Sequence, residues 1–271
     1  MFNLLKHEIF SRRNAIIGWG IGLILFGAMY IAVYPSMAEE MAAIDLSDIA
    51  MYEAMGLEMS NFESYLSSAV VQYITIIMIV YAIISGTATL AGEEESGTLE
   101  LLVSTPIPRW QIVTVKALAL AIVTFLILAV AGAGNAAILA ATEIDTAVTP
   151  LDLFLATLSG WPLTLAFTMI GLFLGALLPG RRTAAMTATV LFIASYFGNG
   201  LSGMVGSLEP LRPLSLFHYF DATAELFTEG VQAGDAALLL GVALVFCLLA
   251  LISFQRRNIT VGAWPWQRAA T

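Results

Sequence analysis

The sequence predicts an all-α polytopic membrane protein with six transmembrane helices. Of its 271 residues, 59% are hydrophobic and only 11% are charged, whereas a soluble domain is about 45–50% apolar and about 25% charged. The apolar residues form long unbroken runs instead of an alternating pattern, which favours helices over a transmembrane β-barrel. The basic residues between these runs gather on one side of the predicted membrane, as they do in multi-pass proteins.

Six apolar runs are long enough to cross the bilayer, which takes about 20 residues for about 30 Å of hydrocarbon. The second and third runs are long enough to tilt or to project beyond the bilayer. We expect residues 1–271 to form a single transmembrane domain, with longer outer segments at 35–64 and 207–235. The predicted spans are residues 15–34, 65–91, 112–141, 153–178, 184–205 and 236–254.

The positions of Lys and Arg predict the orientation of the chain. With the N-terminus inside, one side of the membrane receives ten basic residues and the other receives only Arg212. Fifteen of the twenty acidic residues lie on the side with Arg212. We therefore expect both termini, and the segment 92–109 between the second and third spans, on the cytoplasmic side of the plasma membrane. The ten basic residues are Lys6, Arg12, Arg13, Arg109, Lys116, Arg181, Arg182, Arg256, Arg257 and Arg268.

The first fourteen residues precede the first span and are amphipathic. On a helix, Phe2, Leu5 and Ile9 share one face, while Lys6 and the Arg12–Arg13 pair reach the lipid headgroups. This pattern is typical of a helix that lies flat on the inner leaflet. The alternative is a frayed basic tail that only sets the topology.

Three adjacent carboxylates, Glu93–Glu95, lie between the second and third spans. Because a charge at the bilayer centre costs several kcal/mol, we expect this segment to lie in water as a short, charged bridge between two membrane helices. A rigid bridge of this kind suits a place where a partner outside the membrane pushes on the membrane helices. An ordinary solvated loop is the alternative.

The residues after the three carboxylates are patterned as a short helix. Leu99, Leu102 and Val103 are spaced to share one helical face. Gly97 can end the preceding helix, and Pro106 and Pro108 can end the next turn. The bridge is therefore predicted to be a helical segment that has an apolar face and is bounded by helix breakers.

Residues 93–109 resemble the signature of type-2 ABC export permeases, in which an acidic residue precedes Gly-Thr-Leu-Glu-Leu-Leu, and Pro and a basic residue follow. The resemblance extends over nearly the whole chain. It implies that the bridge is the coupling-helix region, which docks on a separate ATP-hydrolysing subunit. Pro108 departs from the pattern, because the family more often has Ser before the Arg. The residues to which the docking role carries over are Glu93, Glu94, Glu95, Gly97, Thr98, Leu99, Glu100, Leu101, Leu102, Val103, Pro106 and Arg109.

The resemblance also implies partners and cofactors. ATP and Mg are expected on the ATPase subunit and no cofactor on this chain. Two permease chains are expected to pair, each with one ATPase subunit, and no nucleic-acid partner is expected. The outer residues 208–230, with Pro210 and Pro213 ahead of an aromatic run, are implied to form short re-entrant helices. From the residues alone, an aromatic belt anchor is the alternative.

Uncharged polar residues occur within the spans, and no Asp, Glu, Lys or Arg lies mid-span. Interhelical hydrogen bonds explain most residues of this kind, and a place on a translocation path is the alternative. The Gly18/Gly22 and Gly171/Gly175 pairs have the small-xxx-small spacing of close helix contacts, which fits packing or dimerisation. The candidate path residues are Gln72, Thr75, Asn135, Thr164, Thr168 and Asn199.

Several absences narrow the function. Ion-driven carriers usually need a charged group mid-span, and its absence argues against a secondary carrier. The sequence also has no Gly-x-x-x-x-Gly-Lys-Ser/Thr phosphate loop, so this chain is not expected to bind ATP in that way. No Ser/His/Asp or Cys/His set can be assembled near one surface, and His7 and His218 are predicted on opposite faces, so no metal site is expected. We therefore predict the non-enzymatic membrane subunit of an ATP-driven exporter. A secondary carrier or channel, and a non-transporting scaffold or sensor, are the alternatives.

Overall fold

The computed structural model describes residues 2–41, 62–97, 107–142, 144, 146–220, 225–228, 230 and 232–256. All regular secondary structure in these ranges is helical. Six helical segments are long and apolar enough to cross a membrane, which confirms the predicted all-α architecture with six spans. Their bounds are Arg13–Ser36, Phe62–Glu95, Arg109–Ala141, Pro150–Leu177, Arg181–Met204 and Ala233–Arg256.

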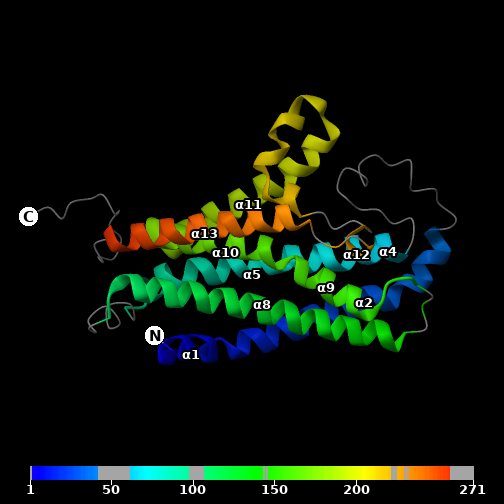
Figure 1. Ribbon diagram of the computed structural model, residues 1–271, viewed down its shortest axis with the longest axis horizontal. Coiled ribbons are helices and arrows are strands. Elements are labelled where there is room, and N and C mark those ends of the chain that lie inside the picture. The colour runs from blue at the N-terminus through cyan, green and yellow to red at the C-terminus, as the bar shows by residue number, and fades with distance from the viewer. Residues whose placement is uncertain are drawn as a thin grey trace, which may run out of the picture.

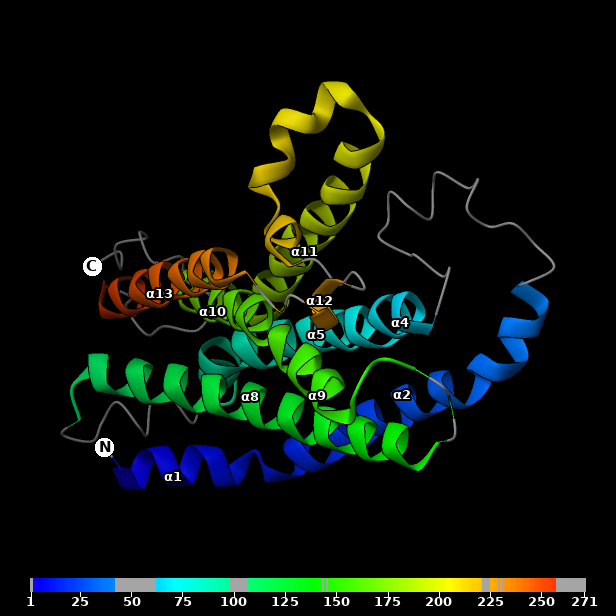
Figure 2. The ribbon, with the colours of Figure 1, turned by 45° about the vertical axis from the view of Figure 1, so that its right-hand side comes forward.

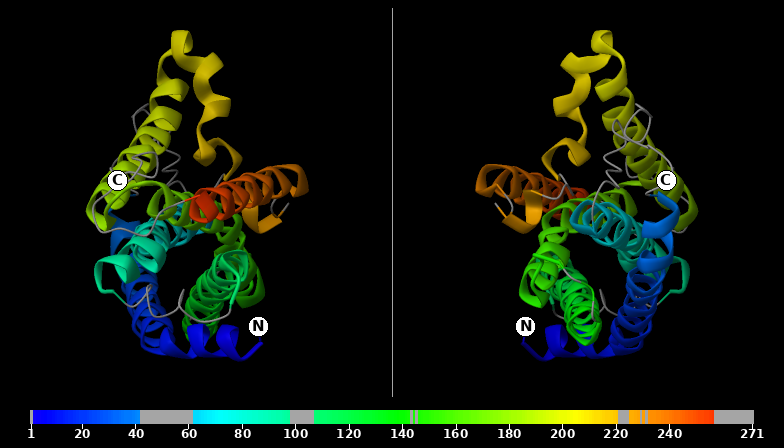
Figure 3. Two further views of the ribbon diagram at one scale, coloured as in Figure 1. Left: turned by 90° about the vertical axis from the view of Figure 1, so that its left-hand side faces the viewer. Right: turned by 90° about the vertical axis from the view of Figure 1, so that its right-hand side faces the viewer.

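Five of the six spans run roughly along the long axis of the molecule (Figure 1). The exception is α11 (Arg181–Met204), which leaves the bundle steeply and forms a projecting hairpin with the 3-10 helix η4 (Gly206–Leu214) (Figures 1 and 2). The views along the bundle in Figure 3 show the same hairpin standing away from the other helices. The helices of the bundle are α2 (Arg13–Met41), α5 (Tyr73–Thr87), α8 (Arg109–Ala141), α10 (Trp161–Leu177) and α13 (Ala233–Arg256).

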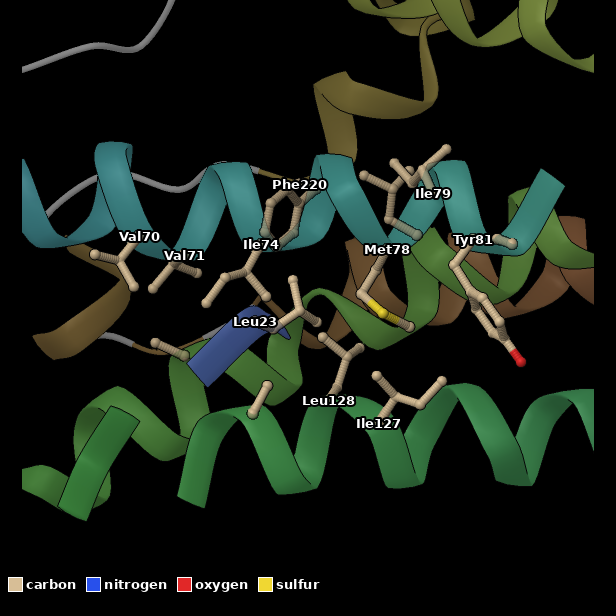
Figure 4. Close-up of a cluster of buried hydrophobic side chains, with 14 of the residues drawn as sticks. Leu23, Val70, Val71, Ile74, Met78, Ile79, Tyr81, Ile127, Leu128 and Phe220 are labelled. Carbon is tan, nitrogen blue, oxygen red and sulfur yellow. The ribbon is translucent and has the colours of Figure 1, made fainter. Parts of the chain in front are cut away.

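The second, third and fourth spans form the core. In an apolar 18-residue stretch of each, 72%, 61% and 78% of the residues are buried, whereas the shares for the first, fifth and sixth spans are 22%, 11% and 22%. Figure 4 shows Ile74 and Met78 of α5 facing Ile127 and Leu128 of α8. Because lipid is the solvent of such a protein, the apolar surfaces of the outer spans need no cover from this chain.

Glycines let α5 and α10 approach to backbone contact. A Cβ atom on Gly86 would lie 2.6 Å from the carbonyl oxygen of Thr168, and one on Gly175 would lie 3.0 Å from that of Thr87. A Cβ atom on Gly171 would lie 3.4 Å from the Cα of Gly86. The spacing of Gly171 and Gly175 fitted either packing or dimerisation. In the structure this pair packs α10 against α5 within the chain.

The Gly18/Gly22 pair behaves differently from the pair on α10. Nothing in the described part of the chain lies within 4 Å of a Cβ atom placed on either residue. Both glycines line an open groove of about 410 Å³ together with Trp19, Leu23 and other apolar residues of α2 and α5. The same sequence spacing therefore gives a closed contact on one helix and an open surface on the other.

The second span is less regular than the uninterrupted run predicted over 65–91. It consists of α4 (Phe62–Tyr65), α5 and α6 (Glu93–Glu95), joined by the π-helical turns η2 (Leu66–Gln72) and η3 (Ala88–Gly92). The hydroxyl groups of Thr87 and Thr89 donate to the carbonyl oxygens of Ile83 and Ser85 at 2.7 and 2.6 Å. Such turns often mark functional sites, and η3 lies directly before the charged bridge.

The fourth span consists of two helices, not the single run predicted over 153–178. The first, α9 (Pro150–Ser159), begins earlier than predicted because Thr149 and Asp152 form a capping box. The second, α10, starts after Gly160 with Pro162 in its first turn, where a missing amide hydrogen is tolerated. Trp161 at this junction donates from Nε1 to the carbonyl oxygen of Ala121 on α8 at 3.2 Å.

The outer segment after α11 is hydrogen-bonded back to that helix. It contains η4, the short 3-10 helix η5 (Leu216–Tyr219) and, further on, α12 (Glu225–Thr228). The hydroxyl of Ser215 donates to the carbonyl oxygen of Ser195 on α11 at 2.7 Å and accepts from the amide of Phe217 at 3.1 Å. The ring of Phe217 is buried, so the aromatic run is not solely a belt anchor at the membrane surface.

We expect Ser215→Ala to loosen η5 from α11, because it removes a buried hydroxyl that makes both bonds. Losing one buried hydrogen bond costs about 1–3 kcal/mol, so amide exchange of residues 216–219 should become faster. Hydrogen exchange of the purified protein measures this effect. Thr187→Ala is the matched control, since that exposed hydroxyl donates to the carbonyl of Thr183 on its own helix and, among the described residues, bonds to no other segment. Equal exchange in both variants would contradict the anchoring role.

Candidate functional site

The two ends of the predicted bridge lie at the same end of the bundle. The second span ends in α6 and Gly97, and α8 begins at Arg109, close to the helix α1 (Phe2–Ser11) (Figure 1). Seven of the twelve residues predicted to dock on a partner fall outside the described residues, and the docking role of all twelve stays a prediction. The seven are Thr98, Leu99, Glu100, Leu101, Leu102, Val103 and Pro106.

Helix breakers define both ends of the bridge. Gly97 has a φ of 75°, a conformation that glycine adopts without steric cost. Its amide donates to the carbonyl of Glu94 at 3.1 Å, which confirms that Gly97 ends the second span. At the other end, Pro108 is extended, with φ −64° and ψ 139°, and its carbonyl accepts from the amide of Gln111 at 2.9 Å. The proline that departs from the family pattern therefore stands at the start of α8.

The three carboxylates turn partly inward, which differs from the expectation of a bridge lying wholly in water. Glu94 is only 5% exposed. Glu93 accepts from Lys116 Nζ at 2.6 Å, and Glu95 accepts from the backbone amide of Arg181 at 2.7 Å. The amide of Arg181 belongs to the N-terminus of α11, where the helix dipole favours a negative charge. The expectation was wrong for Glu94, whose side chain is buried within the protein.

Lys116 lies at the centre of a group of charges that was not predicted from the sequence. Its side chain is 2% exposed, and its Nζ lies 2.7 Å from Oε1 of Glu8 and 2.6 Å from Oε1 of Glu93. Nη2 of Arg12 lies 3.7 Å from Oε2 of Glu8 and donates to the hydroxyl of Thr89 at 3.0 Å. We call Glu8, Arg12, Glu93 and Lys116 the basal ion network.

The basal ion network joins α1, the second span and α8. Its two carboxylates and two cations balance in formal charge, which is the usual condition for burying ionised groups. A signal for it was present in the sequence, because Lys116 is one of only two lysines and stands in an apolar run. What the sequence could not supply was the partner, since Glu8 lies 108 positions away along the chain.

A family model described as "ABC-2 family transporter protein" matches residues 2–259, which include all six spans, the bridge and the basal ion network. The chain belongs to the ABC-2 transporter family. It is thus the membrane component of a transporter, in a family whose permeases normally pair with a separate ATPase subunit. No curated protein matches the chain.

Four of the candidate path residues of this ABC-2 permease are fully buried in its helix packing. The hydroxyls of Thr75, Thr164 and Thr168 donate to carbonyls one turn back on their own helices, at 2.7–2.9 Å. Asn135 donates from Nδ2 to the carbonyl of Leu23 at 3.4 Å. Their bonds are those of packed membrane helices.

The other two candidate path residues, Gln72 and Asn199, are half-buried. The open groove between α2 and α5 is lined by none of the six. Within the described ranges, the structure thus does not bring the candidate path residues together around this groove. Their place on a translocation path stays a prediction.

Proposed function

We propose that this ABC-2 permease is the membrane subunit of an ATP-driven exporter, and that a separate ATPase subunit docks on residues 92–109. The proposal rests on the family match over residues 2–259, together with the position of the bridge between two core helices. Because the sequence contains no phosphate loop, ATP and Mg would bind on the partner. The apolar face of Leu99, Leu102 and Val103 would supply the contact.

The observation that carries the proposal is the rigid mounting of the bridge. Its two ends continue into the second and third spans, which are 72% and 61% buried in the core. The ion pair between Glu93, at the end of the second span, and Lys116, seven residues after Arg109 on α8, joins the two spans at 2.6 Å. A force on either end of the bridge would therefore act on a packed helix.

The mechanism follows from this mounting. ATP binding closes the pair of ATPase subunits, and the bridge follows the surface on which it docks. The second and third spans then tilt as levers, and the outer mouth formed by the fifth and sixth spans opens. Such coupling requires that ATP binding and release favour two different arrangements of the same packed elements.

The assembly we propose contains two permease chains and two ATPase subunits in the plasma membrane, with both permease termini in the cytoplasm. The orientation is supported by the ten-to-one division of basic residues. The first, fifth and sixth spans are buried by 22% or less within one chain, which leaves apolar helix surfaces for lipid and for a second copy. Six spans from a single chain are few to enclose a path for a large substrate.

Replacing Leu99 and Leu102 together by Asp tests the docking claim. Buried apolar contacts at the centre of an interface carry much of its binding energy, so we expect at least about a hundredfold loss of affinity for the ATPase subunit, which corresponds to about 2.8 kcal/mol. Co-purification and ATPase activity of the complex measure the loss. The control is Leu214→Asp, a similar change at a leucine that is 79% exposed in η4. Unchanged assembly and turnover in the double variant would remove the claim.

A further inference from the structure

The basal ion network connects the N-terminal helix to both ends of the bridge. Lys116 on α8 lies between Glu8 on α1 and Glu93 at the end of the second span, at 2.7 and 2.6 Å. Arg12 extends the connection to Thr89 in the π-helical turn η3. A single buried ammonium group thus holds three segments that are distant in the sequence and that meet at one end of the bundle.

Stability alone is a weak explanation for this arrangement. Removing charges from water costs about as much as their mutual attraction returns, and apolar residues of similar size often stabilise a protein as well. What an ion network offers in addition is a defined relative position, because each charge has few alternative partners nearby. Lys116 is 2% exposed, so water offers its ammonium group little replacement for Glu8 or Glu93.

We propose that Lys116 is a positioning residue that fastens α1 to both ends of the bridge, so that α1 moves with the bridge during the ATPase cycle. The inference rests on the proposed function, because it concerns how a movement of the bridge is distributed. Without the network, a push on the bridge separates the two spans from each other and from α1. With it, the N-terminal helix becomes part of the moving unit.

Spin labels on the permease–ATPase complex test this movement without knowledge of the substrate. Cys247 is the single cysteine, so Cys247→Ala gives a background without other thiols in this chain. Asn3→Cys and Ser96→Cys, both exposed, label α1 and the bridge, and Leu214→Cys labels the outer segment. Distances are measured by electron paramagnetic resonance, without nucleotide and after trapping with ADP and vanadate, with the labelled chain diluted by unlabelled chain.

The parent complex should give two different responses to trapping. The distance between the labels at positions 3 and 96 should stay the same, because α1 and the bridge move together. The distance between positions 96 and 214 should change, because the outer segment moves relative to the bridge. A change in the first distance overturns the inference, and this measurement needs no substitution within the network.

Glu8→Gln then removes one carboxylate charge and keeps the ion pair between Lys116 and Glu93. We expect a second, trapping-dependent distance between positions 3 and 96, with the ratio of attached to detached α1 lowered by about tenfold. Glu8→Asp, which keeps the charge, should restore much of the parent distribution. Lys6→Gln is the matched control, because it removes an exposed charge from the same helix.

A parent-like distribution in Glu8→Gln would show that the network does not hold α1, and would overturn the inference alone. An ATPase subunit that neither co-purifies nor changes the distance between positions 96 and 214 would overturn the proposed function, and the inference with it. A merely structural role predicts less folded complex in Glu8→Gln but no second distance in the complex that remains. The three results are distinguishable.

Discussion

Gly86→Leu should abolish folding of the permease, and Gly86→Ala should weaken it. A Cβ atom at this position meets three backbone atoms of α10: the carbonyl oxygen of Thr168 at 2.6 Å, the amide nitrogen of Leu172 at 3.1 Å and the carbonyl carbon of Gly171 at 3.3 Å. Backbone cannot move aside as a side-chain end can, so α5 and α10 must separate. Overpacking of this kind costs about 1–3 kcal/mol for one or two added carbons, and more for a larger group.

Thermal unfolding of the detergent-solubilised protein, monitored by size exclusion, gives the unfolding midpoint of both Gly86 variants. Gly198→Ala and Gly198→Leu on α11 are the matched controls, because no atom of the described residues lies within 4 Å of a Cβ atom there. Both controls should keep the parent midpoint or raise it, since Ala and Leu favour the helix more than Gly does. A parent-like midpoint for Gly86→Leu would mean that α5 and α10 do not cross at this glycine.

Gly27→Ala should destabilise the contact between α2 and α8, and Asn135→Ala should rescue it. The new methyl group would overlap the side-chain amide of Asn135, whose Cγ lies 2.6 Å from the added Cβ. The amide must then rotate away and lose its bond to the carbonyl of Leu23. We expect a loss of about 1–3 kcal/mol for the single variant, measured as a lower unfolding midpoint.

Asn135→Ala should rescue Gly27→Ala because it frees volume for the added methyl group and removes little hydrogen bonding. Asn135 is fully buried, and its Oδ1 has no partner among the described residues. Its Nδ2 donates to the carbonyl of Leu23 across a long distance of 3.4 Å. Asn135→Ala therefore gives up little hydrogen bonding and makes room for the methyl group at position 27. Gly22→Ala on the same helix is the control, because its Cβ would meet open space. A double variant no more stable than Gly27→Ala would show that another contact causes the loss.

The glycines at helix contacts were only partly predictable from the sequence. The small-xxx-small spacing identified Gly171 and Gly175 as candidates for a close contact, and α5 is their partner. Gly27 has no small residue four positions away and Gly86 has only Ala82, and neither was singled out, although a methyl group at either would overlap a neighbouring helix. Whether a glycine is needed depends on what faces it, and a single helix sequence does not contain that information.

The residues of the candidate site were likewise only partly predictable from the sequence. Gly97 was predicted as a helix end from its own conformational freedom, and its φ of 75° agrees. Glu93 was predicted as a solvated carboxylate, but it pairs with Lys116 of the same chain. Lys116 was noted only as part of the basic bias, because its partners Glu8 and Glu93 come from separate helices.

The sequence by itself determined the number of spans and the helix breaks that bound the bridge, because hydropathy, length and the conformational limits of glycine and proline are local properties of the chain. The tertiary structure alone decided which charges are buried together, which glycines touch backbone and which helices form the core. These are properties of pairs of residues that can lie a hundred positions apart, as Glu8 and Lys116 do. They come into existence only when the helices pack.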